Sequence, residues 1–251
     1  MMQAVLMKAE QAQDILHKAV DRMQDLGAEF SDARSQTVRV TGVSSMNGDI
    51  RQLVQKSTGG VCLRAWAGGR GGYGTATSFD REDVMRAAEQ AVRNASGERK
   101  SDLMLEPATV REHRRADVRI HPDSVDLSEK IAAAQDLDRA QAVDDRIINR
   151  VGSYSEEVKT NALVNSAGSD LSWEEVRTLC RAMSVAADGQ RMERYYDGPD
   201  STLGYEVVRD ADLEELGRVT AREAIETLKA DRAPSGNLTV ISDPMVSGLL
   251  A

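Results

Sequence analysis

The stretch Gly60-Val61-Cys62-Leu63-Arg64-Ala65-Trp66 predicts a β-strand, because it starts at the turn signal Gly59-Gly60 and contains Val61, Leu63 and Trp66, which favour strands. Successive side chains of a strand point to opposite faces, so Cys62, Arg64 and Trp66 are expected to share one face. We interpret Arg64 on that face as an arginine held by a structural partner, and a substrate contact is the alternative.

The sequence around this strand keeps the same character from residue 28 to residue 78. A second β-type piece is Thr37-Val38-Arg39-Val40-Thr41, and turn signals stand at Asn47-Gly48 and Gly59-Gly60. These features predict a meander of antiparallel strands.

A second meander is predicted further along the chain. β-branched and polar residues alternate over 145–196, where Asn165-Ser166-Ala167-Gly168 and Asp188-Gly189 are candidate hairpin turns. The apolar residues 238–241 predict one more short strand.

Apolar residues at helical spacing predict four longer helices. Asp80 is a candidate N-cap whose carboxylate would accept bonds from the first-turn amides, and Asp126 with Glu129 and Asp212 with Glu215 have capping-box spacing. The expected helices cover residues 4–26, 80–94, 126–142 and 212–228, and Gly27 is the expected left-handed stop of the first helix.

The order of these elements favours an α+β fold over a doubly wound parallel sheet. It consists of two meanders of mainly antiparallel strands, each with flanking helices. The expected organisation is an N-terminal α+β unit (1–95), a polar connection or surface loop (96–123) and a second α+β unit (124–251). The similar halves suggest a loose duplication, although no residue-level repeat is visible.

Composition argues against several classes of function. Lys and Arg number 32 against 41 Asp and Glu, and the formal net charge of -9 would repel a nucleic-acid backbone. The N-terminus lacks the apolar core of a signal peptide, and no stretch approaches the ~20 apolar residues of a membrane span. A cytoplasmic protein that binds neither nucleic acid nor a membrane is expected.

Cysteine and histidine give no metal-site pattern. Cys62 and Cys180 are far apart and form no CxxC pair, so both are expected to be buried small hydrophobic residues. His17, His113 and His121 lack the i, i+4 spacing of a helical zinc motif, so surface or structural roles are expected.

The run Gly69-Arg70-Gly71-Gly72-Tyr73-Gly74 matches the GxGxxG pattern of dinucleotide-binding loops. Strand-like residues follow it, and the next helix starts only at Asp80, too late to point its N-terminus at a pyrophosphate. We interpret the run as a flexible hairpin connection.

The last residues predict the start of another helix. Asp243 is a candidate N-cap, and Pro244 suits the first helical position, where its missing N–H costs nothing. The sequence stops at Ala251 after about two turns, below the ~12 residues at which isolated helices become marginal. The intact protein is therefore expected to continue beyond Ala251.

Four segments occur in an order and spacing that are typical of one protein family. They are Ser57 to Ser78, Val164 to Gly168, Tyr196 to Asp200 and Ala233 to Ala251. Together they resemble the N-terminal region of TldD/PmbA-type zinc metallopeptidases, over essentially the whole chain. The resemblance would place Ala251 just before the His-Glu-x-x-x-His motif of that family.

The resemblance implies a peptidase in which two histidines on one helix and a third, downstream ligand hold Zn²⁺. The glutamate beside the first histidine would act as general base on the metal-bound water. This chain contains no such motif. Zinc and catalysis are therefore expected of the full-length protein, and no catalytic or metal-ligating residue is expected within these 251 residues.

The resemblance also implies a peptide or unfolded polypeptide as substrate, and pairing with a second copy or with a related TldD/PmbA-type subunit. Arg64, Tyr73 and Asn165 are the candidates for the substrate cleft, and Asn165 with Gly168 is otherwise explained as a turn. Exposed strand edges would bind a peptide as an additional strand. The alternative is a non-catalytic, PmbA-style partner subunit or interaction module.

Overall fold

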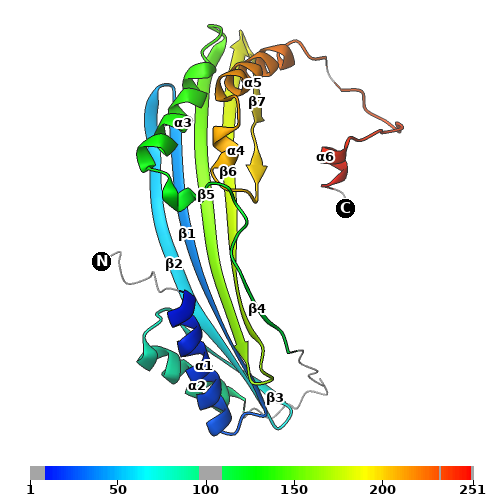
Figure 1. Ribbon diagram of the computed structural model, residues 1–251. Helices are drawn as coiled ribbons and strands as arrows, with labels where there is room; N and C mark the ends of the chain where they lie inside the picture. Colours follow the sequence, from blue (N-terminus) through cyan, green and yellow to red (C-terminus); the bar gives the residue numbers. More distant parts are fainter. Residues whose placement is uncertain (1–8, 96–108, 232, 250–251) are drawn as a thin grey trace.

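The computed structural model describes residues 9–95, 109–231 and 233–249, which form a long, bowed sheet with helices at both ends (Figure 1). The first half contains α1 (Ala9–Asp25), β1 (Phe30–Met46), β2 (Asp49–Ala67), β3 (Arg70–Ala76) and α2 (Arg81–Asn94). The connection contains β4 (Arg111–Arg114) and the 3-10 turn η1 (Pro122–Ser124). The second half contains α3 (Leu127–Ala140), β5 (Ile147–Asn165), β6 (Asp170–Asp188), β7 (Arg191–Asp197), β8 (Asp200–Ser201), α4 (Glu206–Arg209), α5 (Leu213–Thr227) and α6 (Pro244–Ser247).

The two predicted meanders are joined in one sheet of order β3-β2-β1-β5-β6-β4, and β7 and β8 pair with β6. Strands β1 and β5 run antiparallel from the pair Asp32 and Asn165 to the pair Met46 and Val151. All pairings are antiparallel except that of β4 with β6. The α+β class is therefore confirmed, whereas the domain boundaries at residues 95 and 124 stay a prediction.

The hairpin turns are set by local sequence. Asn47 and Gly48 have φ values of 52° and 95°, as the two central residues of a type I′ turn require, so the predicted Asn-Gly turn is confirmed. The predicted turns at Gly168 and Gly189 are confirmed as well. The turn predicted at Gly59-Gly60 is wrong, because β2 continues through both residues.

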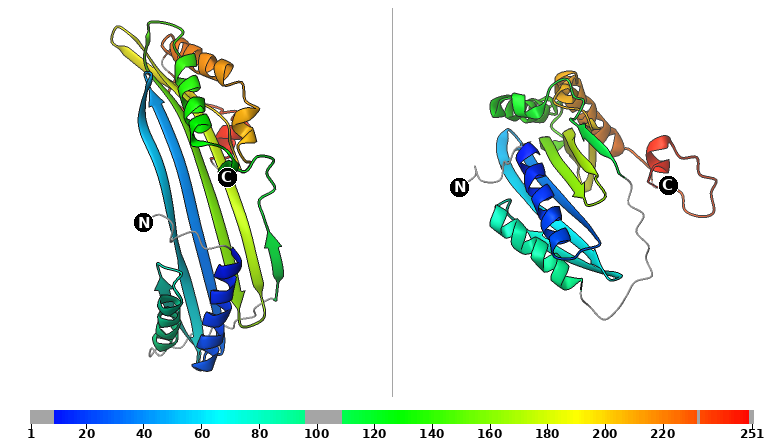
Figure 2. Two further views of the ribbon diagram at one scale, coloured as in Figure 1. Left: turned by 60° about the vertical axis from the view of Figure 1, so that its left-hand side comes forward. Right: turned by 60° about the horizontal axis from the view of Figure 1, so that its bottom comes forward.

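Helices α1 and α2 at one end and α3 and α5 at the other cover one face of the sheet, as Figure 2 shows. Ala33 packs with α1 and α2, and Val43 packs with α3. These two residues of β1 are ten positions apart, so they lie on the same face. Among the described residues, no helix covers the middle of this face, between the two helix groups.

Two glycines of β3 allow α2 to pack directly against the strand. A Cβ at Gly72 would lie 2.1 Å from the carbonyl oxygen of Ala91, and one at Gly74 would lie 1.9 Å from that of Ala87. The flexible connection predicted for the GxGxxG-like run is therefore wrong: most of it is strand, and its glycines make room for a helix backbone.

The helices start at the predicted N-cap residues, but only some of the predicted capping bonds form. Asp80 and Asp126 occupy N-cap positions, but neither side chain makes the predicted capping bond. Asp212 accepts from the amide of Glu215 at 2.9 Å, and Asp243 accepts from the amide of Val246 at 2.8 Å.

The predicted surface loop is partly wrong, because residues 111–114 add β4 to the sheet. The strand predicted for 238–241 is also wrong: these residues form no strand, and Ile241 is 96% exposed. The first helix ends before Gly27, whose φ of 93° is the predicted left-handed stop. Residues 4–8 and 96–108, which belong to predicted elements, lie outside the described residues.

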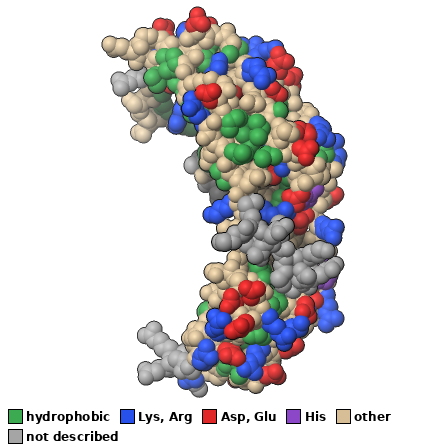
Figure 3. All heavy atoms as spheres, turned by 90° about the vertical axis from the view of Figure 1, so that its left-hand side faces the viewer, with side chains coloured by type: hydrophobic (Ala, Val, Ile, Leu, Met, Phe, Trp, Pro, Cys, Tyr) green, Lys and Arg blue, Asp and Glu red, His purple; other side chains and the backbone are tan. Residues whose placement is uncertain are grey.

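Charged side chains of both signs are interspersed over the end of the molecule that carries α1 and α2 (Figure 3). Among the described residues, no helix is long and apolar enough to cross a membrane.

Candidate functional site

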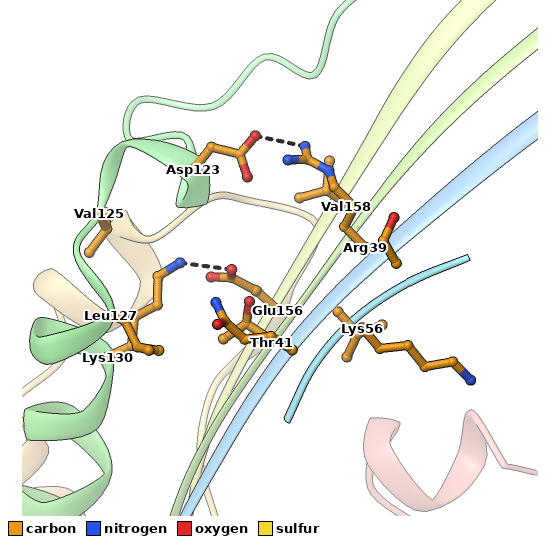
Figure 4. Close-up of a pocket in the computed structure, with 12 residues that line it drawn as sticks. Arg39, Thr41, Lys56, Asp123, Val125, Leu127, Lys130, Glu156 and Val158 are labelled. Carbon is orange, nitrogen blue, oxygen red and sulfur yellow. Dashed lines mark hydrogen bonds and ion pairs between the residues drawn. The ribbon is translucent and has the colours of Figure 1, made fainter. Parts of the chain in front are cut away.

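A cavity of about 430 Å³ lies on the helix-bearing face, where the sheet emerges from beneath α3 (Figure 4). Its walls come from three neighbouring strands, from η1 and from the first turn of α3. The lining residues are Arg39, Val40, Thr41, Gln55, Lys56, Ser57, Asp123, Val125, Leu127, Lys130, Glu156 and Val158.

The floor of the cavity holds a buried ion pair. The Lys130 ammonium donates to Glu156 Oε1 at 2.7 Å and to the carbonyl oxygen of Pro122 at 2.9 Å. The other carboxylate oxygen of Glu156 accepts from the hydroxyl of Tyr154. Burial, followed by this bond to Glu156, raises the pKa of Tyr154 well above its usual value. Both oxygens of Glu156 are thus occupied by donors.

The rim of the cavity holds a second, more exposed ion pair. Arg39 on β1 donates to Asp123 of η1 at 2.7 Å, and the two side chains are 29% and 47% exposed. Figure 4 shows both ion pairs opening toward the same space. The hydroxyl oxygen of Ser57, on β2, is buried and has no hydrogen-bond partner in the described part of the chain.

The three sequence-predicted cleft residues lie elsewhere, in one row across the sheet. Tyr73 of β3 is opposite Arg64 of β2, Arg64 is opposite Asp32 of β1, and Asp32 is opposite Asn165 of β5. The structure therefore brings Arg64, Tyr73 and Asn165 to one end of the sheet and adds Asp32, which sequence reasoning missed. The signal for Asp32 was a charged residue inside a strand-like stretch.

Arg64 has the structural partner that its position suggested. Its guanidinium donates to Asp32 Oδ2 at 2.5 and 2.7 Å, and the Asp32 side chain is only 5% exposed. Burial lowers the pKa of Arg64, but its bonds with Asp32 and Tyr73 outweigh this effect and raise the pKa overall.

Asn165 and Tyr73 differ in their surroundings. The side-chain oxygen of Asn165 accepts from the amides of Ala167 and Ser169 at 3.0 and 2.9 Å, so it holds its own turn together. Tyr73 is 58% exposed. A substrate contact by Arg64, Tyr73 or Asn165 stays a prediction.

The histidines bond to neighbouring polar groups at the surface. His17 lies 2.9 Å from Asp170, His113 lies 2.9 Å from Ser172, and His121 lies 3.5 Å from Glu174. Among the described residues, no group of three His, Cys, Asp or Glu side chains could hold a metal ion. The donor set in this part of the chain therefore does not fit a catalytic zinc ion, which needs three protein ligands.

The two cysteines differ in burial. Cys180 is fully buried, as predicted, and burial raises its pKa to about 12. The prediction that Cys62 is buried is wrong: it is exposed, because it shares the face of the sheet opposite to α1 and α2.

Two family models match most of the sheet and its helices. The first, PmbA/TldA metallopeptidase domain 1, matches residues 31–95, and the second, the PmbA/TldA metallopeptidase central domain, matches residues 120–231. The chain belongs to the PmbA/TldD family. The second matched segment begins beside η1 and includes the whole of α3, so each of the two family domains supplies walls of the cavity.

A curated relative and solved structures are similar to this chain over most of its length. A protein of Methanothermobacter thermautotrophicus named Metalloprotease is 26% identical over 88% of this chain and 48% of its own length. TldE from Thermococcus kodakarensis has a TM-score of 0.66 at 17% identity, covering 84% of this chain and 47% of that chain. A Bacteroides thetaiotaomicron structure, described as a candidate modulator of DNA gyrase, has a TM-score of 0.77 at 19% identity, covering 95% and 55%.

The two structural matches show the shared fold. The chain spans about half the length of the curated relatives it matches.

Proposed function

We propose that this chain forms the peptide-binding part of a zinc metallopeptidase of the PmbA/TldD family, whose metal ligands lie outside these 251 residues. The observation that supports this most directly is the ordered match of two metallopeptidase domains over residues 31–231. The 251 residues contain no His-Glu-x-x-x-His motif. The protein is proposed to act in the cytoplasm, as a homodimer or with a related subunit.

The unpaired edge of β2 is the proposed binding surface for an extended peptide. Residues 49–60 of β2 pair with β1 on one side, and β3 pairs only with residues 61–67 on the other. Within the described residues, the outer edge of 49–60 therefore has no partner strand. A peptide that adds to this edge would bind through backbone hydrogen bonds and with little dependence on sequence.

Backbone NMR of the chain with an extended peptide tests this surface. The amide signals of residues 49–60 should shift on titration, and a peptide N-methylated on alternate amides should bind at least tenfold more weakly. Shifts confined to positions away from every sheet edge would contradict the proposal.

Metal analysis and peptidase assays test whether zinc binding and catalysis require residues outside this chain. The purified chain is expected to contain far less than one zinc per molecule and to leave a fluorogenic peptide intact, while the intact protein contains zinc and cleaves it. Stoichiometric zinc in the 251-residue chain, or cleavage of the peptide by it, would refute the proposal that the metal ligands lie outside these residues.

A non-catalytic partner subunit is the second candidate function. The lack of a metal-binding group of side chains in the described residues fits this role too. An intact protein that binds peptide but contains no zinc and cleaves nothing would favour it.

A further inference from the structure

The cavity between β1, β2, β5 and α3 contains hydrogen-bond donors that its paired carboxylates do not use up. Glu156 is occupied by Lys130 and Tyr154, and Asp123 accepts from Arg39. A guanidinium carries five N–H donors, so the bond to Asp123 leaves Arg39 with further donors. A ligand with acceptor atoms would satisfy these donors.

Two further groups at the cavity point to the same conclusion. The Ser57 hydroxyl is buried without a partner among the described residues, which costs about 1–3 kcal/mol for a neutral polar group. The N-cap residue Asp126 makes no side-chain capping bond, so it leaves the first-turn amides of α3 without this acceptor. Leu127, the first residue of that turn, lines the cavity.

The balance of charge in the cavity argues against a ligand of high charge. Two cationic side chains, Arg39 and Lys130, face the cavity and are paired with the carboxylates of Asp123 and Glu156, whereas the Lys56 side chain points away from it (Figure 4), so the cavity carries no net charge. The whole chain, in contrast, carries a net charge of -9. An anion with one negative charge, bonded to Arg39, would be repelled less by these two carboxylates than a phosphate with two charges.

The rest of the lining suits an aliphatic group. Val125, Leu127 and Val158 contribute apolar walls, and 430 Å³ falls within the range of small-ligand pockets. Gln55, Lys56 and Ser57 belong to the unpaired stretch of β2, so the cavity adjoins the edge at which we place the peptide.

We propose that this cavity binds the C-terminal carboxylate of a peptide whose last side chain is aliphatic. Arg39 and Ser57 donate to the carboxylate, and Val125 and Val158 contact the side chain. This inference rests on the proposed peptide-binding function and assigns one end of the bound peptide.

Isothermal titration of the chain with N-acetyl-Ala-Ala-Ala-Val compares the free acid with the C-terminal amide. The free acid should bind at least tenfold more tightly. Arg39→Gln should weaken binding of the acid about tenfold and Ser57→Ala about threefold, with little effect on the amide. Arg86→Gln makes the same chemical change on the exposed face of α2, where the arginine is 63% exposed, and should change neither affinity.

The outcomes separate this inference from the function on which it rests. Equal binding of acid and amide would overturn the carboxylate site and leave edge binding intact, whereas binding of neither would overturn both. Inorganic phosphate and acetate are then compared as competitors of the free acid. Stronger competition by phosphate would identify a phosphate site and overturn the carboxylate assignment. An Arg39→Gln chain that binds the acid normally would also overturn it.

Discussion

Asp32 and Arg64 form a buried ion pair across β1 and β2, with guanidinium nitrogens 2.5 and 2.7 Å from one carboxylate oxygen. The Asp32 side chain is 5% exposed and that of Arg64 is 33% exposed. The other oxygen of Asp32 accepts from Arg34 at 3.3 Å, whose side chain is 57% exposed. Arg64 is therefore the main partner of a carboxylate that has lost most of its water.

Arg64→Met should lower the free energy of unfolding by about 1–3 kcal/mol, because it leaves a buried carboxylate with one weak partner. Arg34→Met is the matched control on the same carboxylate and should cost about 0–1 kcal/mol, since its bond is longer, at 3.3 Å, and the Arg34 side chain is 57% exposed. Urea unfolding followed by circular dichroism measures both changes.

The double variant Asp32→Leu with Arg64→Met separates structure from substrate binding. It should be more stable than Arg64→Met alone, because no unpaired charge remains buried. If Arg64 also contacts the peptide, the double variant will recover stability without recovering peptide affinity. A double variant that is no more stable than Arg64→Met would argue against the ion pair as the cause.

Gly72→Ala and Gly74→Ala should each destabilise the fold by about 3 kcal/mol or prevent it from forming, since the new Cβ would overlap the backbone of α2. Gly42→Ala is the control: it lies in β1 with no heavy atom within 4 Å of the added Cβ. Its effect should be about 1 kcal/mol or less, and it is expected to be stabilising. Thermal unfolding of the three variants tests this, and equal melting temperatures would contradict the close helix contact.

Sequence reasoning succeeded where structure depends on neighbours in the chain. Asn47-Gly48 gives a hairpin because these two residues tolerate positive φ, and Gly27 ends α1 for the same reason. The alternation of side chains along β2 was also sufficient to place Arg64 on the other face of the strand from Leu63 and Ala65, which are buried.

It failed where structure depends on distant segments. No feature of the β1 sequence indicates that it pairs with β5, which lies more than 100 residues away. The two meanders could therefore not be recognised as one sheet. The glycines of β3 were interpreted as a flexible connection, because the sequence does not show that α2 packs against them. The cavity floor is formed by Lys130 and Glu156. Their pairing could not be predicted, because it depends on the packing of α3 against β5.

Tyr154 and Tyr205 should keep their protons above pH 10 in the folded chain. Burial is the main reason that the pKa of each is raised, to about 12 for Tyr205. Unfolded tyrosines titrate near pH 10, so above this pH the unfolded state holds fewer protons than the folded state, and stability falls as pH rises. Phenolate absorbance should show two of the five tyrosines ionising only when the chain unfolds.

Two substitutions check the assignment of these protons. Tyr154→Phe should reduce the steepness of the fall in stability above pH 10, because it removes one of the retained protons. Tyr196→Phe should leave the steepness unchanged, since Tyr196 is 58% exposed. Full ionisation of all five tyrosines in the folded chain would contradict the burial of Tyr154.

The two thiols should react with Ellman's reagent at very different rates. The reagent attacks thiolates, and with a pKa of about 12 only roughly one Cys180 side chain in ten thousand is a thiolate at pH 8, in addition to being fully buried. Cys62 is exposed on the open face of β2. One thiol per chain should therefore react in the folded protein and the second only on unfolding. Cys62→Ser should abolish the fast reaction and Cys180→Ser should preserve it, because each removes one thiol from a different face of the sheet. Rapid labelling of Cys180 in the folded chain would mean that α3 and α4 open readily from β6.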